Sequence, residues 1–329
     1  MIELKFEVET WKYIKPFVIS REVLEEDCLI VVSVTENGLT GRGEGVPVGY
    51  AGESIDSVLA QLNAIKHKVR EGMVAKDIQV MLPHGAARNA LDCALWDLQS
   101  KRKKQSVWQL AGLTEFNSLN VTLTLGIDTP EVMANDAKEA NLPLYKVKLK
   151  GDGLDMQRLQ AINAACPKAR LIIDANEGWN FEQLQAYVAE MQQYGVELIE
   201  QPLMVGMDHV LEGYKSPIPL CADESCNDHA SLEGLEKRYD FINIKLDKTG
   251  GLTEALILAK AAQEKGLGLM VGCMAGTSLS MAAGAIIGQF CQFVDLDGPL
   301  LYSHDRNSAA NYSNGVMTMP EKDLWGEGK

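Results

Sequence analysis

Charged residues end a series of short, strand-like segments in the second half of this chain. From Asp174 the steps to Glu200, Asp223 and Lys245 are 26, 23 and 22 residues, about the length of one strand, one helix and two loops. Repetition at this period is typical of a β/α barrel, in which every strand delivers its last residue to one shared rim. The spacing therefore predicts that these four side chains lie close together.

The series extends in both directions, because Lys146-Val147-Lys148 precedes it and Asp295-Leu296-Asp297 closes it. Helix-like runs fill most gaps between the strand-like segments, and 253–265 is the clearest of them. We therefore predict the fold class α/β, with a modified (β/α)8 TIM-type barrel over residues 113–300. Its eight strands are expected at residues 119–125, 144–149, 170–174, 196–200, 219–223, 241–245, 268–272 and 291–295.

The first part of the chain has a different order of predicted strands and helices. Its opening residues alternate as strands do, and Asn37-Gly38 predicts a hairpin turn. Helices are expected over 53–73 and from about 86 to 101. Strands followed by separate helices indicate an N-terminal α+β capping domain over residues 1–112, and part of 300–329 is expected to cover it.

Composition narrows the classes of partner. A net charge of −14 and a pI near 4.9 disfavour nucleic-acid binding, which draws on a concentrated basic surface. No segment approaches the ~20 apolar residues that span a membrane, and the N-terminus lacks the layout of a secretory signal. The seven cysteines are dispersed, which suits reduced thiols. We expect a cytoplasmic protein with no nucleic-acid or membrane partner.

Asp174, Glu200 and Asp223 each follow an apolar run and precede a turn. Three oxygen ligands without histidine or cysteine suit Mg²⁺ better than zinc. One strand-end aspartate would more simply cap the next helix. Three in register, with lysines on both sides, instead favour a metal site that holds one Mg²⁺ ion per subunit.

Lys148 and Lys245 flank these carboxylates in strand order. Solvated lysines are the alternative, although inward side chains of a barrel are buried and lysine is rarely buried without a partner. Two inward lysines on opposite sides of a metal would approach a substrate from opposite faces. A lysine that acts as a base needs a pKa below its usual value of about 10.4. Desolvation, the cation and the other lysine are expected to lower it.

The motifs around these residues resemble those of the enolase superfamily, muconate-lactonizing-enzyme subgroup. They are Lys146-Val147-Lys148, Asp174-Ala175-Asn176, Glu200-Gln201-Pro202, Ala222-Asp223-Glu224-Ser225 and the run from Asn243 to Gly251. The resemblance covers essentially the whole chain. It implies that the three carboxylates bind Mg²⁺ and that Lys148 and Lys245 are an acid/base pair, which removes a proton α to a carboxylate and returns one to the opposite face. Lys146 would contact the substrate carboxylate and hold its partner's pKa down.

Asp295 and Asp297 place two carboxylates on one side of the predicted pocket. A turn before Gly298 is the simpler role for them. Their motif resembles that of the dipeptide epimerases, where it binds the α-ammonium of the first residue. The runs 85–97 and 295–299 are especially similar to those of bacterial L-Ala-D/L-Glu epimerases. The resemblance implies an isomerase that inverts the C-terminal residue of a small dipeptide, in the recycling of murein peptides.

Three further residues are expected to bind the substrate. Arg21 follows a capping-loop segment, and a guanidinium matches a carboxylate bidentately. The resemblance implies that Arg21 meets the side-chain carboxylate of a glutamate residue. Tyr50 lies in the second expected capping loop and is expected to close the pocket, and Met274 follows the seventh strand. A homo-oligomer is the expected assembly.

Other functions share parts of this pattern. An N-acylamino acid racemase, an o-succinylbenzoate synthase or a muconate cycloisomerase would use the same machinery, but their substrates carry no ammonium and leave Asp295 and Asp297 without a role. A Schiff-base aldolase that uses Lys148 or Lys245 would need no metal. A barrel that only binds a ligand would leave the substrate's α-proton in place.

Overall fold

The computed structural model describes residues 2–319 and 323–326, and its first element is a three-stranded antiparallel sheet. The sheet has the order β1 (Ile2–Val18), β2 (Val23–Glu36), β3 (Leu39–Gly45). Asn37 and Gly38 form the turn between β2 and β3, with φ of 51° and 81°. The predicted hairpin is therefore confirmed, because these two residue types tolerate positive φ.

Helix α2 (Ala86–Lys103) lies against β3 at a distance that only glycine allows. A Cβ atom at Gly43 would lie 2.2 Å from the carbonyl oxygen of Ala90, and Gly41 and Gly45 are similarly close to α2. Helix α1 (Ile55–Ile65) packs beside it and is shorter than the predicted 53–73. It starts at Ser54, whose Oγ accepts a hydrogen bond from the N–H of Ser57, and it passes into a 3₁₀ turn after Ile65.

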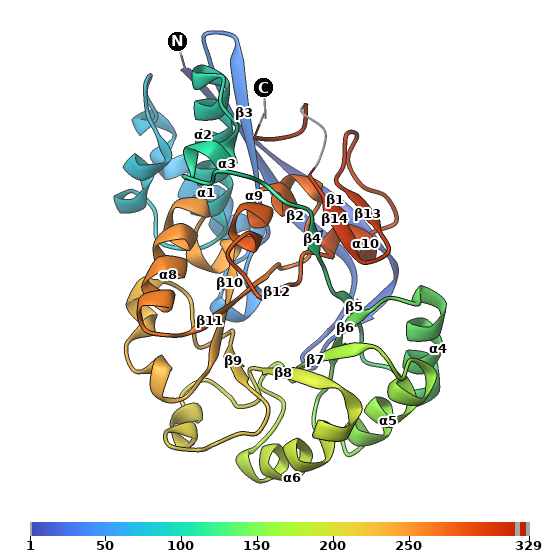
Figure 1. The fold of residues 1–329 in the computed structure, drawn as a ribbon. Helices are drawn as coiled ribbons and strands as arrows, with labels where there is room; N and C mark the ends of the chain where they lie inside the picture. Colours follow the sequence, from blue (N-terminus) through green and yellow to red (C-terminus); the bar gives the residue numbers. More distant parts are fainter. Residues whose placement is uncertain (1, 320–322, 327–329) are drawn as a thin grey trace.

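A curved sheet of eight parallel strands follows, which confirms the predicted barrel-type fold (Figure 1). At the seam between its first and last strands, the N–H of Thr122 donates to the carbonyl of Val294 at 2.9 Å. The predicted strand 119–125 is divided, because β4 (Leu119–Asn120) pairs with another sheet. The eight strands are β5 (Leu123–Leu125), β6 (Leu144–Lys148), β7 (Arg170–Asp174), β8 (Val196–Glu200), β9 (Leu220–Ala222), β10 (Phe241–Lys245), β11 (Gly268–Gly272) and β12 (Phe293–Val294).

Alternation along these strands separates an apolar layer from a charged one. Side chains two residues apart share a face, so Leu144, Lys146 and Lys148 all point inward from β6. The inward residues near the strand starts form a small core cluster of Leu144, Ile172, Leu198, Cys221, Met270 and Phe293. The next inward positions carry Lys146, Asp174, Glu200, Asp223 and Asp295. The charged layer therefore lies at the carboxyl ends of the strands.

Helices cover the outside of most of the sheet, but the crossovers after β8 and β9 hold only short 3₁₀ turns. The longer outer helices are α4 (Pro130–Ala140), α5 (Asp155–Ala165), α6 (Phe181–Met191), α8 (Leu252–Glu264) and α9 (Ser278–Gly288). The shorter helices are α3 (Val107–Leu110), α7 (Leu246–Thr249) and α10 (Gly298–Leu301), and the 3₁₀ turns after β8 and β9 are Asp208–Leu211, His229–Leu232 and Leu235–Lys237. Within the described residues, no helix is both long and apolar enough to cross a membrane.

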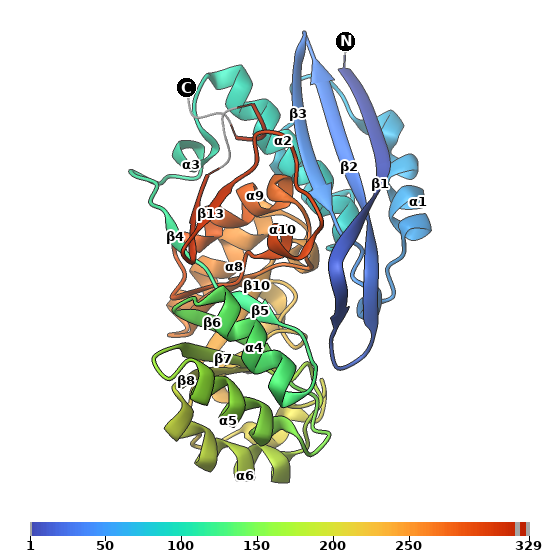
Figure 2. The ribbon, with the colours of Figure 1, turned by 90° about the vertical axis from the view of Figure 1, so that its right-hand side faces the viewer.

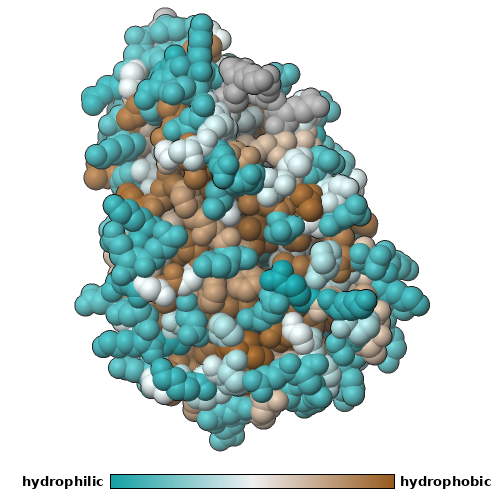
Figure 3. Space-filling view, in the orientation of Figure 1, coloured by the Kyte–Doolittle hydropathy of each residue, from teal (hydrophilic) through white to brown (hydrophobic). Residues whose placement is uncertain are grey.

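The end of the chain returns to the first helices. Strands β13 (Asn311–Ser313) and β14 (Val316–Thr318) pair with β4 in a third sheet. Trp325 is then buried against α2, where its Nε1–H donates to the carbonyl of Cys93 at 3.1 Å. Figure 2 shows the first sheet standing beside the barrel. Figure 3 shows the face of the molecule that lies away from this sheet, where apolar residues in the centre are surrounded by polar ones.

Candidate active site

Strand register places the charged residues side by side at one end of the barrel. Lys148 on β6 pairs with Asp174 on β7, and Asp174 pairs with Glu200 on β8. Asp223 lies one residue beyond the end of β9, and Lys245 ends β10. The carboxylate side chains of Asp174, Glu200 and Asp223 are fully buried. The shared rim predicted from the spacing is therefore present.

Lys146 is the cation at the centre of this rim. Its Nζ lies 2.9 Å from Asp174 Oδ2, 2.7 Å from Glu200 Oε2 and 2.8 Å from Asp295 Oδ2. Burial lowers the pKa of Lys146, but these carboxylates outweigh that effect and raise it well above its usual value. The ammonium thus neutralises acids at the ends of three strands.

Lys148 reaches the cavity above this layer. Its Nζ donates to Asp174 Oδ2 at 2.7 Å and to Asn176 Oδ1 at 3.1 Å. Asn176 has a φ of 40°. Residues Glu177, Gln201 and Ala275, which also follow strands of the barrel, share positive φ values. Non-glycine residues in this region cost free energy, and such strain is typical of functional sites.

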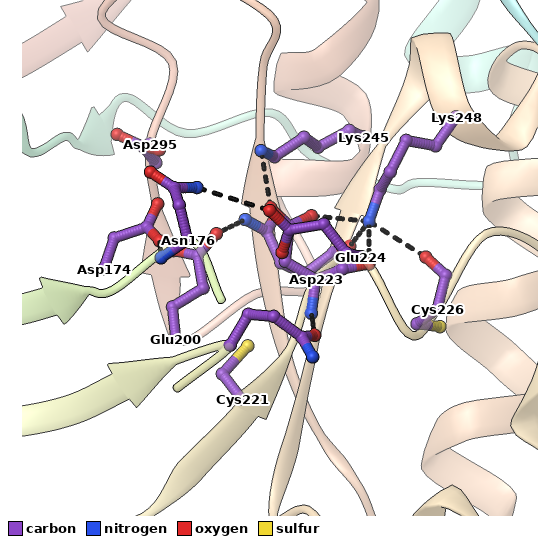
Figure 4. A network of polar contacts seen from close by, with 12 residues as sticks. Asp174, Asn176, Glu200, Cys221, Asp223, Glu224, Cys226, Lys245, Lys248 and Asp295 are labelled. Atoms are coloured by element: carbon purple, nitrogen blue, oxygen red, sulfur yellow. Dashed lines mark hydrogen bonds and ion pairs between the residues drawn. The ribbon is translucent and has the colours of Figure 1, made fainter. Parts of the chain in front are cut away.

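Asp223 is held between two lysines (Figure 4). Its Oδ2 accepts from Lys245 Nζ at 2.8 Å, and its Oδ1 accepts from Lys248 Nζ at 2.6 Å. Lys248 is completely buried and also donates to the carbonyls of Cys226 and Asn243, so it acts as a fixed structural cation. Sequence reasoning gave Lys248 no role, although it lies three residues after Lys245 in the same motif.

The electrostatics of the rim differ from the expectation in one respect. A lowered pKa was expected for the base beside a bound cation, and without a cation the pKa of Lys245 is raised instead. Burial lowers the pKa of Lys245, but Asp223 and Glu200 raise it further, and the net pKa is well above the usual value. Burial and the neighbouring Asp174 raise the pKa of Glu200 to about 8.

This donor set fits a hard divalent cation. Asp174, Glu200 and Asp223 supply three buried carboxylates from adjacent strands, which is the oxygen chemistry that Mg²⁺ prefers. Asn243 Nδ2 donates to Glu200 Oε1 at 2.8 Å and orients it. As they stand, no three acidic, histidine or cysteine side chains of the described part of the chain are grouped to hold a metal. In this arrangement Lys146 lies against two of the three carboxylates, Asp174 and Glu200.

A cavity of about 570 Å³ lies above the rim. Its floor is lined by Lys146, Lys148 and Lys245. Arg21, Tyr50 and Met274 line its walls, together with Asp295 and Asp297. The cavity thus brings residues from the loops of the first sheet to the carboxyl ends of the barrel strands, although even Tyr50 and Lys146 are 96 positions apart.

Arg21 connects both capping loops to the barrel. Its Nη1 lies 2.6 Å from Glu177 Oε2, and its Nη2 lies 2.6 Å from Glu224 Oε1. The guanidinium also stacks on the ring of Tyr50, 4.8 Å from its centroid. Glu177 and Glu224 were not singled out from the sequence, because nothing local relates them to Arg21. Arg21 Nε donates to no described residue, so the guanidinium keeps a donor for a further carboxylate.

Asp295 and Asp297 lie at the seam of the barrel. Asp295 Oδ1 accepts from the hydroxyls of Thr122 and Thr124, at 2.7 and 3.3 Å. Asp297 Oδ2 accepts from the N–H of Thr124 at 2.6 Å. Burial raises the pKa of Asp295, but Lys146 outweighs it and the net pKa is lowered. Burial and Asp295 raise the pKa of Asp297 to about 7. Asp295 is therefore satisfied within the protein, and Asp297 is less fully bonded.

Two family models match the chain. "Mandelate racemase / muconate lactonizing enzyme, N-terminal domain" matches residues 1–112, and "Enolase C-terminal domain-like" matches residues 132–324. The chain is 43% identical over 312 residues to an L-Ala-D/L-Glu epimerase of Escherichia coli, covering 94% of this chain and 97% of that one. It is 42% identical over 301 residues to an N-acetyl-D-glutamate racemase of a Pseudoalteromonas species, covering 91% and 95%.

Solved structures agree with these relatives. An enolase family member from Agrobacterium tumefaciens, described as homologous to dipeptide epimerases and solved with sodium and L-Ala-L-Glu, is 39% identical with a TM-score of 0.96, covering 99% of this chain and 100% of that one. A dipeptide epimerase from Enterococcus faecalis, solved with Mg and L-Leu-L-Tyr, is 27% identical with a TM-score of 0.91, covering 99% and 98%. This chain therefore belongs to the enolase superfamily, in its mandelate racemase and muconate-lactonizing-enzyme branch.

Proposed function

We propose that this protein is a Mg²⁺-dependent dipeptide epimerase, and that its substrate is L-Ala-D/L-Glu. The observation that carries the proposal is the placement of Lys148 and Lys245 in one cavity. Their strands, β6 and β10, are four positions apart in an eight-stranded barrel, so the two ammonium groups enter from opposite sides. An α-carbon held between them can lose its proton to one lysine and regain a proton from the other on the opposite face.

Proton transfer requires one neutral and one charged lysine. The two lysines have different partners, since Lys245 contacts Asp223 and Lys148 contacts Asp174 and Asn176. Asp174, Glu200 and Asp223 would hold Mg²⁺, and the bound cation would stabilise the charge that develops on the substrate carboxylate when the α-proton leaves. A cation on these carboxylates would also weaken their hold on Lys245 and lower its pKa.

The remaining residues of the cavity would fix the substrate. Arg21 would accept the side-chain carboxylate of the second residue through its remaining donors, with Tyr50 stacked behind it. Asp297, together with Asp295, would take the α-ammonium of the first residue. Lys146 would face the substrate carboxylate from the floor, and Met274 would pack against the peptide. The roles of Arg21, Asp295, Asp297 and Lys146 extend the resemblance described above, whereas Tyr50 and Met274 are assigned because they line this cavity.

The biological setting follows from the substrate. L-Ala-D-Glu is a fragment expected from bacterial cell-wall peptides, so the enzyme would act in murein peptide recycling in the cytoplasm. We place residues 1–112 as the capping domain and 113–300 as the catalytic barrel, with a homo-oligomer as the assembly. The relative that acts on N-acetyl-D-glutamate makes an N-acylamino acid racemase the competing function.

A dipeptide library in D₂O separates these functions. The purified protein is incubated with L-Xaa-L-Xaa dipeptides, N-acetyl-glutamate or other N-acyl amino acids. Each incubation is done once in Mg²⁺ and once in chelator, and deuterium uptake is followed by mass spectrometry. We expect deuterium at one α-position, that of the C-terminal residue, only with metal, and most rapidly for Ala-Glu. Exchange restricted to N-acyl amino acids would identify the racemase instead. A borohydride-trapped adduct formed without metal would identify an aldolase.

A further inference from the structure

Asp27 is a carboxylate on the cavity wall that the proposed reaction does not use. It lies on β2 and lines the cavity together with Tyr13, Cys273 and Ala275. The hydroxyl of Tyr13 donates to Asp27 Oδ2 at 2.5 Å, and the hydroxyl of Tyr302 donates to the same oxygen at 2.7 Å. The Tyr302 oxygen in turn accepts from the N–H of Gly276 at 3.0 Å. Two phenols from distant parts of the chain therefore fix the orientation of this carboxylate.

The second oxygen of Asp27 has no such partner. Within residues 2–319 and 323–326, Oδ1 accepts no hydrogen bond, and no lysine, arginine or histidine forms an ion pair with Asp27. Burial raises the pKa of the Asp27 carboxyl more than the phenol hydrogen bonds lower it. A partly buried carboxylate without a counter-charge is costly, and a ligand that brings a cationic donor would offset that cost.

The proposed function assigns every other group of the dipeptide to a residue of the cavity, so the group that would face Asp27 can be deduced if that function is correct. The second residue's α-carbon lies between Lys148 and Lys245, its side chain extends toward Arg21, and the first residue's α-ammonium extends toward Asp297. The side chain of the first residue is then left for the remaining wall, which contains Asp27 and the small Ala275. An alanine methyl group there would leave Asp27 Oδ1 without a partner.

We propose that Asp27 is a specificity-determining residue that, among dipeptides whose first side chain is long enough to reach it, selects those that end in an ammonium group. The phenols of Tyr13 and Tyr302 hold one carboxylate oxygen, and the other accepts the ammonium. Among dipeptides with a glutamate second residue and a long first side chain, those with a basic first residue are therefore preferred, while Ala-Glu, whose methyl group makes no use of Asp27, stays the substrate of the proposed function.

Matched pairs of dipeptides test this directly. Ornithyl-Glu is compared with norleucyl-Glu, and 2,4-diaminobutyryl-Glu with norvalyl-Glu, because each pair differs only in an ammonium or a methyl at the chain end. For the wild type we expect kcat/KM to favour the ammonium member of at least one pair about tenfold. Asp27→Asn should reduce that ratio to one or below, while it retains turnover of the methyl member.

Glu22→Gln is the control, because Glu22 lines the same cavity and its removal changes the cavity charge equally. It should leave the ratio within about twofold. If the wild-type ratio of kcat/KM for the ammonium and methyl members is at or below one in both pairs, the inference is refuted without any variant. It is also refuted if Asp27→Asn and Glu22→Gln lower that ratio equally. If the wild type exchanges no dipeptide in D₂O, the proposed function itself fails. Exchange without an ammonium preference refutes only the role of Asp27.

Discussion

Replacing Lys146 by methionine should destabilise the protein when no metal is present. Methionine keeps most of the buried stem and removes only the charge, so no large cavity forms. Asp174, Glu200 and Asp295 each lose a cation that lies within 2.9 Å. Removing one partner of a buried ion pair typically costs about 3–5 kcal/mol, because a charge is left uncompensated.

The corresponding shift is measurable by thermal unfolding. In a chain of this size 1 kcal/mol changes the midpoint by about 2 °C, so Lys146→Met should lower it by roughly 6–10 °C in chelator. Added Mg²⁺ should raise the midpoint of the variant more than that of the wild type, because a bound cation then offsets the carboxylates.

Lys260→Met is the matched control, since Lys260 is largely exposed and lies 3.9 Å from an equally exposed Glu264. A surface pair of this kind contributes little to stability, so its midpoint should stay at the wild-type value. If Lys146→Met unfolds at the wild-type temperature in chelator, the ammonium does not neutralise the rim, and the electrostatic account of the site is wrong.

Further predictions concern the lysine pair, a buried acid and the packing of α2. Lys148→Ala and Lys245→Ala should each abolish epimerisation, and each should keep slow α-deuterium exchange for one epimer only, read by NMR on both epimers. Burial raises the pKa of the Asp92 carboxyl to about 7, whereas in the unfolded chain its pKa is 3.8. The protonated carboxyl therefore contributes its full stabilisation below pH 3.8, and this contribution is lost as the pH rises toward 7. Asp92→Asn should therefore gain up to a few kcal/mol relative to wild type between pH 4 and 7 in urea unfolding, and a constant difference would contradict this. Gly43→Ala should cost about 1–3 kcal/mol, because its Cβ would lie 2.2 Å from a carbonyl oxygen of α2. Gly49→Ala, with no atom within 4 Å of the new Cβ, should be near neutral by the same denaturation assay.

The periodicity of the sequence determined which side chains reach the rim. Strand-end residues spaced by one β/α unit converge in a barrel whatever the helices between them contain, and a period of two decides which residues point inward. Asp174, Glu200 and Lys245 therefore followed from spacing alone. The hairpin at Asn37-Gly38 followed equally from local chemistry, because it needs two residues that tolerate positive φ.

The partners of these side chains were decided only by the tertiary structure. Lys146 lies against three acids on β7, β8 and the end of the barrel, and Arg21 joins Glu177 and Glu224 across more than 150 positions. Tyr302 reaches Asp27 from the other end of the chain. Hydrogen bonds and charge balance depend on distances of a few ångströms between residues far apart in sequence, and no local pattern encodes those distances. The direction of the Lys245 pKa shift depends on the same distances, since desolvation and ion pairing oppose each other and only the geometry decides which prevails.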